Sequence, residues 1–264
     1  MPPILQSFLP FAPWADPRTR RLPGVLPVEP GDWLRVDDAY RGQMAERDRL
    51  LFAHPGEVMA LEPGAIAAAL ELLLQVLPEL SPLGFVVGDA DVRRPDGVTV
   101  PIDLAAPLLT LGRLCQEDFC ILQKRGDVHV LTGAVLCFPA SWTLSEKFQR
   151  PLIGVHQGVA AYDAELAPRV QRLFDAIRVG QPLWRWNALL YASDLLHHPR
   201  SERTPRSKPI GRAPFVRSER QCLVRLPETQ AVVFSIHTYL VRFEDLSPQQ
   251  VYALDAFPLH RGGG

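Results

Sequence analysis

The sequence predicts an α+β fold, in which an antiparallel sheet follows an N-terminal region of helices. Two observations lead to this prediction. Between residues 38 and 77, apolar side chains recur at the spacing of amphipathic helices. After Glu117 the chain changes to runs rich in β-branched and aromatic residues, which are typical of strands. A chain of 264 residues is long enough to bury a core without disulfide or metal support.

The first 36 residues are rich in proline and are expected to be extended. The whole chain has 26 prolines, roughly twice the usual frequency of about 5%. We expect this arm to lie on the surface of the domain and to be anchored there by aromatic side chains. These are Phe8, Phe11, Trp14 and Trp33.

Two helices should follow the arm. The first covers residues 38–52 and uses Asp38 as its cap. The second covers residues 65–77 and ends at Pro78. The first helix is expected to bury Tyr40, Met44, Arg47 and Leu51, and the second Leu70, Leu73, Leu74 and Leu77.

The sheet is predicted to begin with a hairpin over residues 117–139, whose turn has Gly126 at its centre. Thr143 and Glu146 have capping-box spacing, in which the Thr oxygen accepts from a backbone N–H, so a short helix should follow. Another helix is expected over residues 168–178, with Gly180 just past its end. Three further strands are predicted over residues 183–191, 215–227 and 231–243.

Charge and composition exclude several classes of function. The net charge is −1 and the isoelectric point is about 6.7, so no chain-wide positive field attracts nucleic acid or an anionic membrane. The longest apolar stretch, residues 65–77, is shorter than the roughly 20 residues that cross a bilayer. The N-terminus lacks the basic and apolar pattern of a secretory signal. We therefore expect a cytoplasmic protein.

Common catalytic motifs are absent from the sequence. It has no phosphate-binding GxxxxGK[ST], no GxGxxG, no GxSxG and no HExxH. Cys115 and Cys120 are too far apart for a typical zinc pair, and no second pair follows. Residues 195–214 carry five basic side chains against one Glu, which fits either a solvated loop or a docking surface for an acidic partner.

Three polar residues in apolar surroundings leave alternatives open. Arg220 interrupts an otherwise apolar strand face, so it needs an anion, either a buried Asp or Glu or the carboxylate of a ligand. His237 is either a satisfied core histidine or part of a pocket lining. His156 follows an apolar run and precedes a Gln-Gly pair, so it is either structural or a metal ligand.

Several short motifs together resemble the heme-dependent oxidative N-demethylase alpha-subunit-like family, over about Leu22 to Leu246. They are Asp32-Trp33-Leu-Arg-Val-Asp-Asp38 with Tyr40, Cys137-Phe-Pro139, Trp142 with Leu144, Glu146 and Lys147, Arg150-Pro151-Leu with His156, and Arg217-Ser-Glu219-Arg220-Gln221 with Arg225-Leu-Pro227. The resemblance implies a single PAS-like α+β domain over residues 1–264 that holds heme b. The arm and helices of residues 1–80 would pack on this domain.

The resemblance also implies roles for individual residues. His156 would be the proximal heme ligand, with Cys137 as a competing and less favoured ligand. Arg220, Arg225 or Lys147 would bind the heme propionates, and His237 is the next candidate ligand. Glu219, Glu146 or Tyr162 would accept a proton from an amine substrate.

The implied reaction is the oxidation of a methyl carbon next to the nitrogen of a small secondary amine such as dimethylamine. Dioxygen is consumed, and the products are a shorter amine and an aldehyde. Electrons would come from NAD(P)H through a flavin and iron–sulfur reductase partner. Two other functions stay open: a PAS-like sensor or binding module without turnover, and a related heme oxygenase acting on a non-amine substrate.

Overall fold

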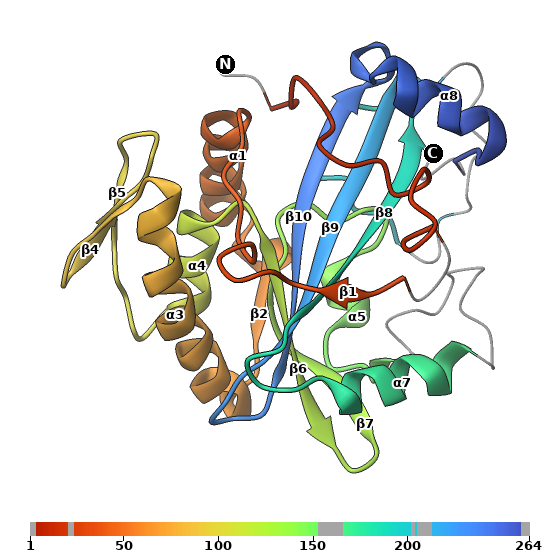
Figure 1. Cartoon of the computed structure of the whole chain (residues 1–264). Coiled ribbons are helices and arrows are strands. Elements are labelled where there is room, and N and C mark those ends of the chain that lie inside the picture. The colour runs from red at the N-terminus through yellow and green to blue at the C-terminus, as the bar shows by residue number, and fades with distance from the viewer. Residues whose placement is uncertain (1–3, 21–23, 153–165, 202–203, 205–212, 260–264) are drawn as a thin grey trace.

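A seven-stranded antiparallel sheet forms the centre of the protein in the computed structural model (Figure 1). The structure describes residues 4–20, 24–152, 166–201, 204 and 213–259. The strands are β1 (Leu26–Pro27), β2 (Met59–Leu61), β6 (Asp118–Arg125), β7 (Val128–Val135), β8 (Leu183–Tyr191), β9 (Phe215–Arg225) and β10 (Val232–Arg242). Their order is β1-β8-β9-β10-β6-β7-β2, and all neighbours are antiparallel. The predicted α+β class is confirmed.

The predicted strands and hairpin are present. Strands β6 and β7 form the hairpin, and Gly126 occupies its turn with φ of 59°, a conformation that glycine adopts easily. Strands β8, β9 and β10 follow in the expected order. Because alternate residues of a strand point to opposite faces, the register of these three strands decides which side chains lie together.

Three helices cover one face of the sheet, which we call the α1 face. They are α1 (Tyr40–Ala53), α3 (Ile66–Leu80) and α4 (Pro107–Leu114), and Figure 1 shows them on the same side. Their apolar side chains pack with Phe119, Ile121 and Val233 of the sheet in a large buried cluster. The predicted stripe of the first helix is confirmed, since all four of its members are buried.

Helix α3 differs from its prediction in length and in orientation. It continues through Pro78 to Leu80, because proline removes only one N–H and Leu74, four residues earlier, lies on the solvent side. Leu74 is 54% exposed, so its predicted core position is wrong. By length and composition alone, Pro63–Leu83 could cross a membrane, but here α3 packs against α4. The buried side of α3 consists of Ala68, Ala69, Leu72, Leu73, Val76 and Leu80.

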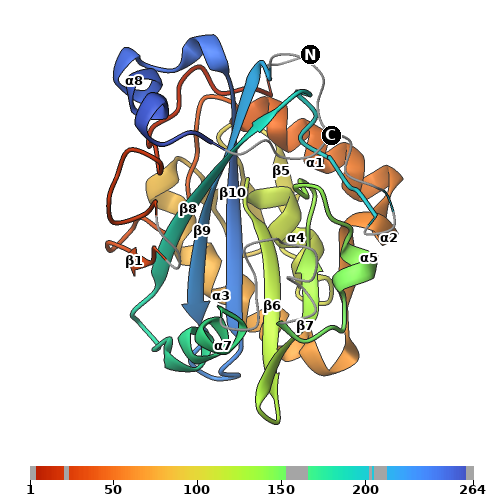
Figure 2. The same ribbon diagram turned by 90° about the vertical axis from the view of Figure 1, so that its right-hand side faces the viewer.

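The opposite face of the sheet, which we call the α7 face, carries α5 (Leu144–Lys147) and α7 (Leu166–Ala176) (Figure 2). Phe174 and Ile177 pack on Leu223 and Val232 of the sheet in a second buried cluster. Gly180 follows the helix with φ of 72°, as predicted.

Two predicted helix caps make different contacts. Ala39 is the N-cap of α1, and the Asp38 carboxylate instead accepts hydrogen bonds from the backbone and hydroxyl of Ser7. The Thr143 hydroxyl donates to the Glu146 carboxylate at 2.7 Å, and it does not cap the backbone of α5. The capping-box prediction is therefore wrong, because the carboxylate is the stronger acceptor for this hydroxyl.

The proline-rich arm packs beside α8 (Pro248–Ala256), at the end of the α1 face. Trp14 is buried with Trp186 and Tyr239, and the Trp33 indole donates to the Ser235 hydroxyl at 3.0 Å. Phe8, by contrast, is 59% exposed, so its predicted anchoring role is wrong.

Smaller elements complete the described chain. A three-stranded sheet of β3 (Val86–Val87), β4 (Asp91–Arg93) and β5 (Thr99–Pro101) lies beyond α3 and α4 (Figure 1). The short helices are α2 (Pro55–Val58), η1 (Pro63–Ala65), η2 (Ser81–Leu83) and η3 (Phe243–Asp245). In the basic stretch, residues 202–203 and 205–212 lie outside the described residues, so neither interpretation of that stretch is tested.

Candidate functional site

A strip of polar side chains crosses the middle of the α7 face. The strand register places Asn187 beside Glu219 and Glu219 beside Thr238. Two residues further along, Arg185 lies beside Gln221 on the same face. We call these five residues the polar strip. The neighbouring part of this face, under α7, is apolar.

Glu219 is the centre of the polar strip. Its Oε2 accepts hydrogen bonds from the side-chain amides of Asn187 at 3.1 Å and of Gln221 at 2.9 Å. Its Oε1 lies 3.5 Å from the Nε of Arg217. The Glu219 side chain is only 9% exposed, so these contacts hold its carboxylate in one orientation on the face of the sheet.

Several buried polar atoms around Glu219 have no hydrogen-bond partner in the described part of the chain. They are Arg185 Nε, Arg217 Nε, Gln221 Oε1 and Thr238 Oγ1. Buried polar atoms are nearly always hydrogen-bonded in folded proteins, and each one left alone costs about 1–3 kcal/mol. Four such atoms within one region make the polar strip our candidate for a ligand site.

Two arginines, Arg185 and Arg200, give this region a positive charge. Neither arginine forms an ion pair with any residue that the structure describes, and the Nε of each is buried. Burial lowers the pKa of Arg185, and the charge of Glu219 opposes this effect only in part. An anion would stabilise both guanidinium groups.

The predicted ligand His156 and the predicted proton acceptor Tyr162 lie outside the described residues, in the stretch 153–165. The described chain before this stretch ends at Leu152, whose side chain packs on the α7 face. The described chain resumes with α7 on the same face. The roles of His156 and Tyr162 stay predictions.

His237 lies on the α1 face and is a satisfied core histidine. Its Nδ1 is 3.0 Å from the Glu117 carboxylate, and its Nε2 is 3.0 Å from the Asp37 carboxylate. Burial alone would lower the pKa of His237, but the two carboxylates raise it to about 9. Both ring nitrogens are therefore occupied and the ring is cationic at neutral pH. This contradicts the suggested role of His237 as a second heme ligand.

Arg220 also lies on the α1 face, because it alternates with Glu219 along β9. Its guanidinium donates to the backbone carbonyls of Asp32 and Trp33 and pairs with the Asp32 carboxylate at 3.0 Å. The buried-pair interpretation of Arg220 is confirmed. It lies on the opposite face of the sheet from Glu219 and Arg225, and its suggested role at the propionates stays a prediction.

The other predicted site residues lie on the α7 face but apart from the polar strip. Arg225 donates to the carbonyls of Phe174 and Ile177 at 2.6 Å and so holds the end of α7. Glu146 accepts hydrogen bonds from Thr143 and Ser201, and Lys147 is 3% exposed on α5. The structure therefore brings Arg225, Glu146 and Lys147 to the α7 face and gives Arg225 and Glu146 structural contacts. Whether Lys147 or Glu146 meets a ligand stays a prediction.

The cysteines do not form a metal site within the described ranges. All four are free and buried, and burial raises the pKa of Cys137 to about 12 although Arg47 opposes this. A thiolate ligand at Cys137 is thus disfavoured at neutral pH. Among the described residues, no group of three or more His, Cys, Asp or Glu side chains is arranged to hold a metal ion.

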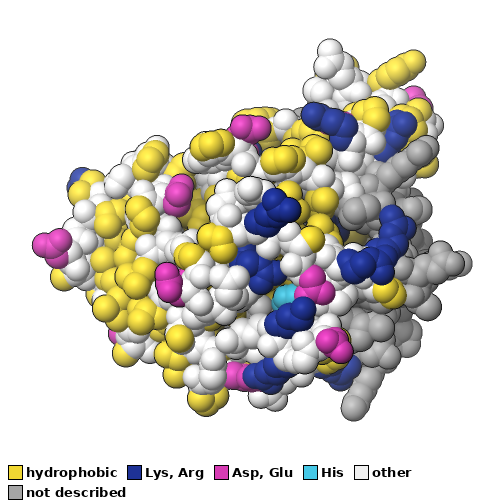
Figure 3. Space-filling model, turned by 60° about the horizontal axis from the view of Figure 1, so that its bottom comes forward, with side chains coloured by type: hydrophobic (Ala, Val, Ile, Leu, Met, Phe, Trp, Pro, Cys, Tyr) yellow, Lys and Arg dark blue, Asp and Glu magenta, His cyan; other side chains and the backbone are white. Residues whose placement is uncertain are grey.

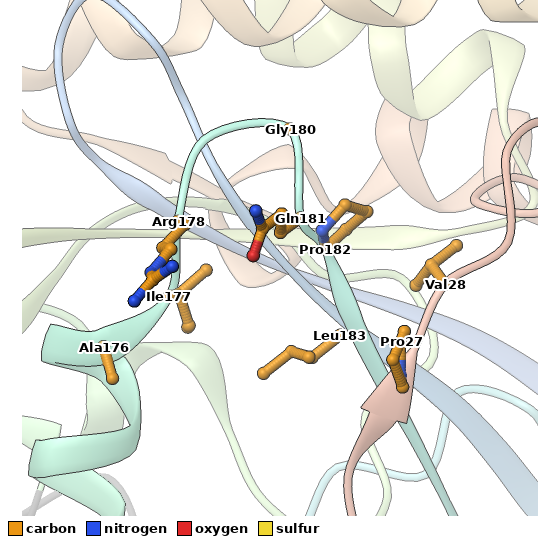
Figure 4. A pocket seen from close by; sticks show the side chains of 9 residues that line it. All are labelled: Pro27, Val28, Ala176, Ile177, Arg178, Gly180, Gln181, Pro182 and Leu183. Atoms are coloured by element: carbon orange, nitrogen blue, oxygen red, sulfur yellow. The ribbon is translucent and has the colours of Figure 1, made fainter.

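A groove of about 370 Å³ lies at the sheet edge, between β1 and the turn after α7 (Figure 4). Its lining is mostly apolar, and Arg178 supplies its charge. Figure 3 shows that hydrophobic side chains gather toward α3 on this side of the molecule, and Lys and Arg side chains toward the residues drawn in grey. The groove has no cluster of buried polar side chains among the residues that line it, so the polar strip is the stronger candidate for the functional site.

The described chain is therefore an α+β protein whose antiparallel sheet carries a polar, partly unsatisfied patch on one face. The particular family follows from comparison of the sequence. A family model described as "Haem-dependent oxidative N-demethylase, alpha subunit-like" matches residues 24–256, and the chain belongs to this family. The family name indicates heme dependence and an enzyme with more than one subunit.

Sequence reasoning identified Glu219 but missed the residues that surround it. Arg185, Asn187 and Thr238 lie on strands whose limits were predicted, yet nothing in the sequence says which strands are neighbours. Strict alternation along β9 was the available signal: it puts Arg217, Glu219 and Gln221 on one face and Arg220 on the other.

Proposed function

We propose that this protein is the heme b-binding oxygenase subunit of an enzyme that demethylates a small secondary amine such as dimethylamine. Membership of the family supports heme dependence. The polar strip supports the location, since its unpartnered buried atoms on a sheet face are what a bound group would satisfy. This second observation carries the proposal.

The residues of the α7 face suit a heme group. Leu223 and Ile236 are apolar and buried there, and Arg185 and Arg200 lack counterions among the described residues. These side chains would take the macrocycle and its two carboxylates, and His156 would be the axial ligand. When bound, the heme supplies activation of dioxygen and oxidation of the substrate's methyl C–H bond.

Glu219 would accept a proton from the substrate. A secondary amine is protonated in neutral water, and a cationic nitrogen resists oxidation of the neighbouring carbon. A buried carboxylate attracts such an ammonium group and can accept its proton at Oε1 or Oε2. Asn187 and Gln221 would keep the carboxylate aimed at the nitrogen through the hydrogen bonds to Oε2. Glu146 and Tyr162 are the alternative acceptors.

Electrons would come from outside this chain. We propose that NAD(P)H reduces a separate flavin and iron–sulfur subunit, which then reduces the heme. A family name that refers to an alpha subunit supports the existence of other subunits. NAD(P)H is a cytoplasmic reductant, in keeping with the localisation that we expect.

Absorption spectra of the purified full-length chain, oxidised and reduced, test the proposal. We expect a Soret band that shifts on reduction, loss of most heme in His156→Ala, and retention in His54→Ala, which changes an exposed histidine. With a reductant, dimethylamine should stimulate oxygen consumption, and Glu219→Gln should reduce this by about 100-fold while keeping the Soret band.

Each other outcome points to a different conclusion. A folded protein without a Soret band after heme reconstitution rejects the proposal entirely. A Soret band without amine-dependent oxygen consumption favours a heme sensor or binding module. Stimulation by a non-amine compound in a substrate panel favours a related oxygenase.

A further inference from the structure

A second group of polar side chains lies at one end of the polar strip, where the segment after β8 returns to the sheet. Arg217 from β9 donates to the backbone carbonyls of Leu196 and Phe138. Ala140 and His198 form a parallel bridge, which fixes the segment beside the strand ends. Backbone hydrogen bonds thus hold the positions from which His198 and Arg200 extend.

Arg217 lies beside a pair of rings, Tyr191 and His198, and His198 belongs to the segment that carries Arg200. The guanidinium carbon of Arg217 is 5.7 Å from the centre of the Tyr191 ring, and the rings of Tyr191 and His198 are 5.6 Å apart. Burial lowers the pKa of His198, and the charges of Arg217 and Arg200 lower it further. Arg217 thus contacts the ring that packs on His198, and Arg200 follows His198 by two residues, so both guanidinium groups extend from positions next to this histidine.

Four buried nitrogens of this group have no partner in the ranges that the structure describes. They are Arg200 Nε, Arg200 Nη1, Arg217 Nε and His198 Nδ1. Two carboxylates lie near this group: that of Glu219, 3.5 Å from Arg217 Nε, and that of Glu146, which accepts hydrogen bonds from the hydroxyls of Thr143 and of Ser201, the residue after Arg200. Buried guanidinium N–H groups without acceptors are costly, and they belong to two different elements. The group therefore has the donors of an anion site.

We propose that Arg200 and Arg217 form a binding site for a single carboxylate group. The unpartnered guanidinium N–H groups of the two arginines suit the flat, two-oxygen geometry of a carboxylate, which arginine binds through paired hydrogen bonds. The carboxylate belongs either to a heme propionate, in which case the inference rests on the proposed function, or to a free small acid.

Titration of heme into the heme-free full-length chain tests the first source. We compare iron protoporphyrin IX with its dimethyl ester, which lacks both carboxylates. Arg200→Gln should weaken binding of the free acid by about 10- to 100-fold and leave binding of the ester unchanged. Arg200→Lys should recover part of the affinity. Arg172→Gln, on the exposed side of α7, is the matched control and should behave like the wild type.

Thermal unfolding of the heme-free chain tests the second source. Benzoate should raise the melting temperature of the wild type and of Arg172→Gln but not of Arg200→Gln, and neutral benzamide should have no effect. Circular dichroism of each variant establishes that it is folded.

The outcomes separate this inference from the proposed function. Either a propionate effect or a benzoate effect that depends on Arg200 supports the carboxylate site and identifies its source. Equal behaviour of Arg200→Gln and the wild type in both assays overturns it. If the wild type binds no heme, the proposed function fails, and the benzoate assay alone decides the inference.

Discussion

At the scale of single residues, the α1 face contains a buried charge cluster centred on His237. The imidazolium lies between Asp37 and Glu117, and Gln116 and Gln6 donate to Asp37 from the sides. His237 is 1% exposed, so its charge depends on these carboxylates. Asp37 belongs to the segment that leads into α1, and Glu117 precedes β6. The cluster thus ties the N-terminal region to the sheet.

This cluster makes stability depend on pH in a defined window. Burial opposes the charge of His237, but its carboxylate partners raise its pKa from 6.5 to about 9. A raised pKa stabilises the fold fully below the unfolded value and loses that effect as pH rises through the folded value. The free energy of unfolding should therefore fall by about 3 kcal/mol between pH 6.5 and 9. Urea denaturation across this range measures the effect.

Two variants isolate the contribution of His237. His237→Gln cannot be protonated, so the decline between pH 6.5 and 9 should disappear even though the variant is less stable throughout. His129→Gln changes a buried histidine whose pKa is lowered by burial, so the decline should remain. An equal slope in the wild type and in His237→Gln would show that the cluster does not titrate in this window.

The residue scale also shows what the sequence could predict. Alternation along β9 and β10 correctly put Arg220 and His237 at buried positions that need partners. It could not supply those partners, because Asp32 is 188 residues from Arg220 in sequence and Asp37 is 200 residues from His237. Nor could it separate the two sides of β9, since Glu219 and Arg220 are adjacent in one short motif.

At the scale of elements, helix α4 fits between α1 and β7 only because Gly112 lacks a side chain. A Cβ at this position would lie 2.7 Å from a methyl of Val135 and 3.1 Å from a methyl of Leu51. Val135 is fully buried and β-branched, so it cannot move aside easily. The close approach of α4 to the sheet therefore depends on this one glycine.

Gly112→Ala should lower the free energy of unfolding by about 1–3 kcal/mol, because overpacking exceeds the gain in helix propensity. The matched control is Gly56→Ala in α2, where nothing lies within 4 Å of the added methyl. This control should be neutral or more stable by up to about 1 kcal/mol. Chemical denaturation compares the two. Equal stability of both variants would mean that α4 shifts to accommodate the methyl.

Two kinds of element were predictable from the sequence: long segments in which apolar residues recur at helical spacing, and runs of β-branched residues. Elements that depend on tertiary contacts were not predictable. Helix α1 and strands β6 to β10 were found from sequence pattern alone. The orientation of α3 was not, because Leu70, Leu73, Leu74 and Leu77 offer two overlapping apolar stripes and only packing against α4 selects one. Helix α4 and the strands of the small sheet are too short to show a repeating pattern, and helix α8 has almost no apolar periodicity, so none of them was recognised.

At the scale of the whole molecule, the N-terminal arm joins parts of the chain that are far apart in sequence. The Trp14 indole donates to the carbonyl of Gln250 at 3.0 Å, and the Gln250 side chain donates to the carbonyl of Leu9 at 2.8 Å. The arm thus connects α8 to the sheet. Residues 4–20 precede the region matched by the family model, 24–256, yet they complete a buried cluster of this fold.

Trp14 gives the arm a measurable role in overall stability. It is 4% exposed and packs in the same cluster as Trp186 and Tyr239, so Trp14→Ala should lower the free energy of unfolding by about 3–5 kcal/mol. Trp14→Phe should recover part of this loss, and Phe8→Ala, at an exposed position of the same arm, should change it by less than about 0.5 kcal/mol. Urea denaturation followed by circular dichroism gives the values.

Because the cluster lies on the α1 face, the folded Trp14→Ala variant should still bind heme as the wild type does. Equal stability of Trp14→Ala and Phe8→Ala would show that the arm covers the molecule without supporting it.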